Sequence, residues 1–193
     1  MIIASPTNDI SYINTGDMGY VAGIELEYRK LIFATKEANA NKLSAGLNAS
    51  YMYTEQELDS EKVKAENDYS AEFTHKKGQF TGASPLLLNA DLTFVKEWND
   101  KESSVSTTLA YSYFSDRVYS IGTAQRGNLV DKGAGTLDFI VKSKLNKELG
   151  LDFGIKNILN PTINRVQENR GGDVSVLSYT KGINFGLGVN YQF

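Results

Sequence analysis

Side chains able to do acid–base or metal chemistry are few and scattered in this 193-residue chain. Glu25 and Glu27 would share one face of a strand, a spacing that suits a pair of acid–base carboxylates. The single histidine, His75, lies in the charged stretch EFTHKKG, and there is no cysteine to join it as a metal ligand. Neither GAG at 133–135 nor GLG at 186–188 precedes a helix start that would complete a phosphate loop. We therefore expect no catalysis, no metal and no cofactor.

Composition narrows the class of protein further. The formal net charge of -3 gives no basic surface for nucleic acid, so we expect no such partner. With 11 Tyr, 9 Phe and only 3 Pro, the chain favours strands over helices. No apolar run reaches the roughly 18 residues of a transmembrane helix. That test does not detect membrane barrels, because alternating strands average out in a hydropathy profile.

Alternation of apolar and polar residues at period two is the main structural signal. It is clearest at the end of the chain, where every odd position from Ile183 to Phe193 is apolar and the even ones are polar or glycine. The pattern predicts seven antiparallel strands, at residues 21–29, 43–54, 87–94, 104–114, 137–145, 149–155 and 183–193. The opening residues 1–5 are expected to be the tail of an eighth.

The predicted connections between these strands alternate in length. The short ones span residues 36–42, 99–102 and 146–148, and the long ones span residues 56–85, 116–135 and 158–180. All short connections therefore fall at one end of the sheet and all long ones at the other. A bacterial outer-membrane barrel has this layout, with short periplasmic turns and long extracellular loops.

Two readings of the apolar face compete. A soluble sandwich or a small stand-alone β-barrel that binds a hydrophobic ligand would turn this face inward. Charge placement favours the membrane instead, because the polar faces of the second, fourth and last strands are uncharged and charge is concentrated in loops such as 55–68. Aromatic residues also lie toward strand ends, as in the girdles of membrane barrels. We therefore predict an all-β fold, an antiparallel up-and-down transmembrane β-barrel segment.

Four stretches resemble the C-terminal part of the barrel of TonB-dependent outer-membrane receptors, of the type abundant in Bacteroidetes. They are GIELEYRK (23–30), FTGASPLLLNADLTF (80–94), LDFIVKSKL with LGLDFGIKNILNP (137–161), and SYTKGINFGLGVNYQF (178–193). In that family a Gly-x-Ser-Pro stretch precedes a strand that carries an Asn, here Gly82, Ser84, Pro85 and Asn89. An Asn-Leu-Leu/Phe-Asn segment ends the penultimate strand, here Asn157 to Asn160. The last strand resembles the signal recognised for outer-membrane insertion, with candidates Phe185, Leu187, Val189, Tyr191 and Phe193.

The resemblance implies transport rather than catalysis. Residues 1–193 would be the C-terminal part of a 22-strand barrel that imports iron chelates, cobalamin or glycans with TonB-supplied energy. Residues near 56–85, 116–135 and 158–180 would be the long extracellular loops that choose the substrate. The implied partners are outer-membrane lipid, the missing N-terminal barrel and plug, the TonB complex through that plug, the outer-membrane assembly machinery, and a surface lipoprotein.

The polar faces of the predicted strands supply candidates for a polar lumen. In a membrane barrel the residues that alternate with the lipid-facing ones point to the interior. These lumen-facing candidates are Glu25, Glu27, Arg29, Asn89, Asp91, Asp138 and Asp152. We expect them to form hydrogen bonds across the wall or to a plug, with contact to a substrate or ion as the alternative.

Overall fold

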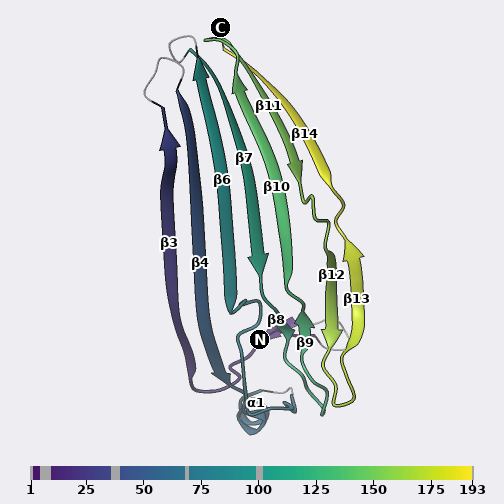
Figure 1. The fold of residues 1–193 in the computed structure, drawn as a ribbon. Coiled ribbons are helices and arrows are strands. Elements are labelled where there is room, and N and C mark those ends of the chain that lie inside the picture. The colour runs from purple at the N-terminus through teal and green to yellow at the C-terminus, as the bar shows by residue number, and fades with distance from the viewer. Residues whose placement is uncertain (1, 5–9, 36–39, 68–69, 99–101, 193) are drawn as a thin grey trace.

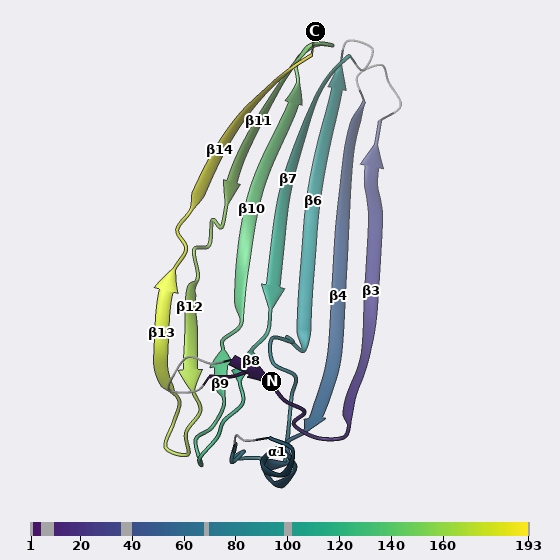
Figure 2. The same ribbon diagram turned by 180° about the vertical axis from the view of Figure 1, so that it is seen from behind.

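The computed structural model describes residues 2–4, 10–35, 40–67, 70–98 and 102–192. Seven long strands form the main sheet: β3 (Gly19–Ala34), β4 (Asn41–Glu57), β6 (Leu86–Trp98), β7 (Ser103–Phe114), β10 (Ala134–Lys144), β11 (Leu149–Lys156) and β14 (Asn184–Tyr191). They are antiparallel in the order β14-β11-β10-β7-β6-β4-β3, and the two-residue β5 (Lys77–Gly78) pairs with β4 (Figures 1 and 2). Each predicted strand coincides with one of these seven. The predicted all-β, antiparallel fold is confirmed.

The prediction of an eighth barrel strand at residues 1–5 is wrong. Residues 2–4 do form a strand, β1 (Ile2–Ala4), but it pairs with β2 (Ile10–Tyr12) in a separate two-stranded sheet. The period-two pattern there is too short to show which sheet a strand will join, because pairing is decided by tertiary contacts.

The two ends of the main sheet differ as predicted. At the end of the sheet where β14 terminates, β3 and β6 end and β4 and β7 begin, and a short turn joins β10 to β11; the long connections lie at the opposite end (Figure 1). Of the short turns, residues 36–39 and 99–101 lie outside the described residues. The third is closed by Asn146, whose side-chain oxygen accepts from the backbone N–H groups of Glu148 at 2.9 Å and Leu149 at 2.8 Å.

One face of the main sheet is mainly apolar on every strand, with Lys30 of β3 and Lys96 of β6 as cations on it. Because the strands are in register, period two on each strand becomes a continuous surface. One row across β4 to β14 contains Ala45, Leu92, Leu109, Phe139, Ile155 and Phe185, and its β3 member is Lys30. Ile24 is 71% exposed and Leu187 80% exposed, so no described part of the chain covers this face. Such a face is stable only against hydrocarbon or another apolar surface.

The buried apolar side chains lie outside this band. The described ones are Ile13, Ala40, Leu58, Val63, Ala71, Val118, Ile121, Val130, Ala134 and Val166. Of these only Ala134, at the start of β10, belongs to the main sheet. The main sheet therefore has no core of its own, and β3 and β14 do not pair with each other among the described residues. This arrangement does not fit a small closed barrel with an apolar interior.

A second sheet extends the wall at the end with long connections. It consists of β8 (Arg117–Ser120), β9 (Leu129–Asp131), β12 (Thr162–Gln167) and β13 (Val174–Thr180), in the order β13-β12-β9-β8. These strands continue β7, β10, β11 and β14 and keep their order, so we call them the extension sheet. The break between the two sheets, at residues 115–116, 132–133, 157–161 and 181–183, is the seam. The segments predicted as loops at 116–135 and 158–180 therefore contain strands.

The first long connection folds into a small packed unit. The helix α1 (Ser60–Glu66) begins after Asp59, whose carboxylate accepts from the N–H groups of Glu61 at 3.0 Å and Lys62 at 3.1 Å. Val63 is fully buried, and Phe73 packs against both small apolar clusters of this region. None of the described helices is long and apolar enough to span a membrane. The long segments are thus anchored by a core of their own.

The exposed position of Leu187 gives a test of which face meets lipid. If this face meets lipid, Leu187→Arg should lower the amount of folded protein in the membrane, because a cation at mid-membrane costs roughly 2 to 4 kcal/mol on the lipid face. Gly186→Arg is the matched control, since it points to the polar face and nothing lies within 4 Å of an added Cβ. Heat-modifiable gel mobility measures the folded fraction. Equal losses in both variants would contradict the assignment.

Candidate functional site

The structure places all seven lumen-facing candidates on the face opposite the apolar one. The register links Glu27 through Asn48 to Asn89, and Arg29 through Gly46 to Asp91. Asp91 continues through Ala110 to Asp138, and Asp152 lies opposite Lys142 on the same face. Their common face is thus observed, whereas its role as the lining of a lumen stays a prediction.

Only some of these candidates lie near one another. The Nε of Arg29 donates to a carboxylate oxygen of Glu27 at 2.8 Å. The Asp91 carboxylate lies directly over Gly46, where a Cβ would collide with it. Asp152 is separate and accepts from the side-chain amide of Asn190 at 2.9 Å. Glu27 is therefore engaged by a cation, and the Glu25–Glu27 spacing does not create an acid–base pair.

Asp138 of β10 binds the Asn157–Asn160 segment of the seam. The Asn157 N–H donates to Asp138 at 2.8 Å, and the Asn157 side chain donates to the Gly182 carbonyl at 2.7 Å. The Gly182 N–H in turn donates to the side-chain oxygen of Asn160 at 2.9 Å. Both asparagines have positive φ, 61° for Asn157 and 41° for Asn160, a region that asparagine tolerates better than other non-glycine residues. This motif therefore connects three chain segments at the point where the wall changes sheet.

Next to the seam, a row of charges crosses three strands of the extension sheet. Asp131 of β9 is buried and lies directly between Arg117 of β8 and Arg165 of β12. Its carboxylate accepts from Nε of Arg165 at 2.6 Å and from Nε of Arg117 at 3.4 Å. The Arg165 guanidinium also stacks on Tyr119, 3.1 Å from the ring centroid. The hydrogen bond to Asp131 raises the pKa of Arg165 above its ordinary value, so this cation is permanent.

Asp116 and Lys132 close the seam between β7 and β10. The Asp116 carboxylate accepts from Nζ of Lys132 at 2.8 Å and from the Gly133 N–H at 2.7 Å. Partial burial acts to raise the pKa of Asp116, but these two donors outweigh it and hold the pKa below the usual range. Nζ of Lys132 also lies 3.5 Å from Oδ2 of Asp173. Sequence reasoning missed these pairs because nothing in a period-two pattern shows which residues meet across a broken ladder.

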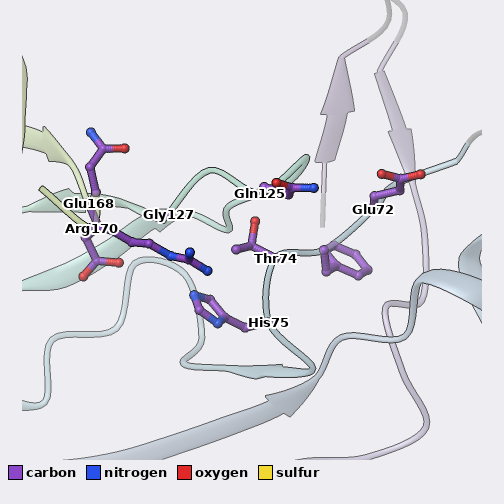
Figure 3. A pocket seen from close by; sticks show the side chains of 9 residues that line it. Glu72, Thr74, His75, Gln125, Gly127, Glu168 and Arg170 are labelled. Carbon is purple, nitrogen blue, oxygen red and sulfur yellow. The ribbon is translucent and has the colours of Figure 1, made fainter.

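All three long segments line one pocket of about 900 Å³, here called the loop pocket (Figure 3). The first segment contributes Glu72, Phe73, Thr74 and His75; the second contributes Gln125 and Gly127; the third contributes Glu168, Asn169 and Arg170. The Arg170 side chain extends toward the imidazole of His75 in Figure 3. His75 is exposed, as expected of a loop residue. The lining combines carboxylates, amides, cations and one aromatic ring, which suits hydrogen bonding to a polar ligand.

Backbone contacts hold the first two segments together at this pocket. The Ala124 N–H donates to the Glu72 carbonyl at 2.8 Å, and the Thr74 N–H donates to the Gly122 carbonyl at 3.1 Å. Ala124 and Gln125 have φ values of 51° and 64°, in the left-handed region that costs an ordinary residue roughly 1 to 2 kcal/mol. Non-glycine residues held there often mark binding sites. The strained turn brings Gln125 to the lining of the loop pocket.

The family model for the β-barrel of TonB dependent receptor-like proteins matches residues 1–158. The chain belongs to this family. The match includes every main-sheet strand from β3 to β11 and ends at the Asn157–Asn160 segment. It is a family of outer-membrane transport receptors rather than enzymes, so the predicted family, its transport class and its membrane context agree with the match. No curated protein and no solved structure matches the chain.

The candidate insertion signal lies beyond the matched residues. Phe185, Leu187, Val189 and Tyr191 occupy the apolar face of β14 and are all exposed, whereas Phe193 lies outside the described residues. Their role in membrane insertion stays a prediction, based on the resemblance of this strand to the insertion signal of the family.

The seam motif should be sensitive to substitution at Asn157. Asn157→Ala removes a hydrogen bond and leaves alanine in the left-handed region, at a combined cost of about 2 kcal/mol. Amide hydrogen exchange in residues 157–161 and 181–183 should then accelerate roughly 30-fold. Asn157→Gly is the matched control, because glycine accepts this φ and loses only the side-chain bond. Equal acceleration in both variants would show that the backbone conformation carries no cost.

Proposed function

We propose that the chain forms part of the wall and the substrate-facing segments of an outer-membrane active-transport receptor that imports a scarce nutrient, an iron chelate, cobalamin or a glycan, with energy supplied by TonB. The convergence of three long segments on the loop pocket carries this proposal. These segments would be extracellular, near 56–85, 116–135 and 158–180, and the short turns periplasmic.

The outer edges of β3 and β14 support a larger barrel. Among the described residues each of these strands has a neighbour on one side only. An unpaired backbone edge is not tolerated in hydrocarbon, so further strands must complete the wall. Residues 1–193 would then be the C-terminal part of a receptor barrel, completed by an N-terminal barrel and plug through which TonB acts.

The two faces of the sheet would have separate partners. The apolar face would meet outer-membrane lipid. The assembly machinery would recognise the C-terminal strand by its apolar residues Phe185, Leu187, Val189, Tyr191 and Phe193. The polar face, with Glu25, Glu27, Arg29, Asn89, Asp91, Asp138 and Asp152, would line the lumen against the plug. A surface lipoprotein would close over the long segments.

The loop pocket offers a direct test of this function. His75 and Arg170 make no hydrogen bond or ion pair with the described residues, so His75→Ala with Arg170→Ala should leave the fold intact. Loss of two ligand contacts should raise the nutrient concentration for half-maximal uptake at least tenfold. Growth on a limiting iron chelate, cobalamin or glycan and uptake of the labelled nutrient are the measurements.

The matched control is Arg126→Ala. Arg126 is an exposed cation next to Gln125, and its side chain does not line the loop pocket. Its uptake should stay within about twofold of the unchanged receptor, at equal outer-membrane abundance. Unchanged growth on every nutrient after deletion of the whole chain would contradict the proposal.

A further inference from the structure

A second pocket, of about 200 Å³, lies at the seam and is lined by residues of both sheets. Thr136 and Asn157 are among its lining residues, and Thr136 shares the polar face of β10 with Asp138. The seam pocket therefore opens on the polar face, between the long segments and the membrane-spanning strands. Its volume suits one functional group of a ligand rather than a whole drug-sized molecule.

The lining of the seam pocket contains more cations than carboxylates. Four of its side chains are cations, Arg117, Lys132, Arg165 and Lys181, whereas Asp131 is the one carboxylate among its described lining residues. An excess of positive charge in a partly enclosed site attracts anions.

The nearby carboxylates do not accept from all the N–H donors of these cations. Lys132 is occupied by Asp116 and Asp173. A guanidinium has five N–H donors, yet Asp131 takes one from Arg165 and two from Arg117, the latter at 3.4 and 3.5 Å. Lys181 is exposed and makes no ion pair with the described residues. Two arginines and a lysine thus retain donors for a further acceptor.

These cations are held in place before any ligand arrives. Arg117 and Arg165 lie on the strands to either side of Asp131, each directly opposite it. The Arg165 guanidinium is also held by stacking on the Tyr119 ring. Lys181 follows β13 and precedes Gly182, which the Asn157–Asn160 segment binds. Preorganised guanidinium groups recognise planar or tetrahedral oxyanions through paired hydrogen bonds.

We propose that the seam pocket binds an oxyanion group, a carboxylate, phosphate or sulfate, of the nutrient. This rests on the proposed function, because it takes the polar face as the lumen. The pocket lies at the roots of the β8–β9 and β12–β13 hairpins, while the loop pocket lies at their tips. A solute entering past the long segments reaches these cations before it reaches the membrane-spanning strands. The group bound would therefore belong to the solute.

The test is titration of the whole receptor, purified in detergent through a tag on this chain, with citrate, sulfate and inorganic phosphate at constant ionic strength. Calorimetry should show binding of at least one of these anions. Lys181→Gln and Arg117→Gln should each weaken it about tenfold, as expected for one charge-assisted hydrogen bond. Lys181→Arg keeps the charge and should bind within about twofold of the unchanged receptor.

Lys156→Gln is the matched control, because Lys156 is an exposed cation of the same polar face that does not line the pocket. It should change affinity less than about twofold. Failure of all three anions to bind, or equal weakening by Lys156→Gln, would overturn the proposal. A third result would also overturn it: no anion binds, and Lys181→Gln releases the plug from the barrel. The seam pocket would then be occupied by an acidic side chain of the receptor itself. The titration involves no transport, so a receptor that binds anions but imports nothing contradicts only the proposed function.

Discussion

The rest of the structure depends on one constraint, that backbone N–H and C=O groups inside hydrocarbon must be paired with one another. A long antiparallel ladder meets it, and β3 and β4 pair almost continuously from Gly19–Gln56 to Ala34–Lys42. Because the ladder keeps strict register, the period-two pattern of each strand merges into one apolar and one polar face. The sheet therefore needs no core beneath it, and the buried apolar residues are found at its ends and in the long connections.

Beyond the apolar band the constraint relaxes, and the ladder breaks at the seam. There the backbone is satisfied by side chains: Asp138 accepts from Asn157, Asn160 accepts from Gly182, and Asp116 accepts from Gly133. Short polar side chains of this kind can replace ladder bonds and tolerate unusual backbone angles. The break lets the wall change direction while the strands keep their neighbours.

This difference explains which features could be predicted from sequence. The seven main-sheet strands were predictable, because lipid imposes alternation on them over their whole spanning length. The extension sheet was not, because β8 and β9 have four and three residues and bulges interrupt the period between Val118 and Ser120 and between Arg165 and Val166. The Arg117–Asp131–Arg165 row joins residues 14 and 34 positions apart, which composition and spacing do not reveal. The sequence identifies Asn157 and Asn160 only as a family motif, whereas their hydrogen bonds to Asp138 and Gly182 are visible only in the structure.

Charge is distributed along the wall in a way that follows from the same constraint. The apolar face carries little charge, with Lys30 of β3 and Lys96 of β6 as cations on it. The polar face holds paired charges, such as Arg29 with Glu27, and also exposed cations such as Lys156, and the pocket at the seam is lined by more cations than carboxylates. An unneutralised cluster is costly within a low-dielectric wall but much less so at the boundary with water. A wall that recognises an anionic group would place its cations at the seam, below the mixed charges of the loop pocket and above the membrane-spanning strands.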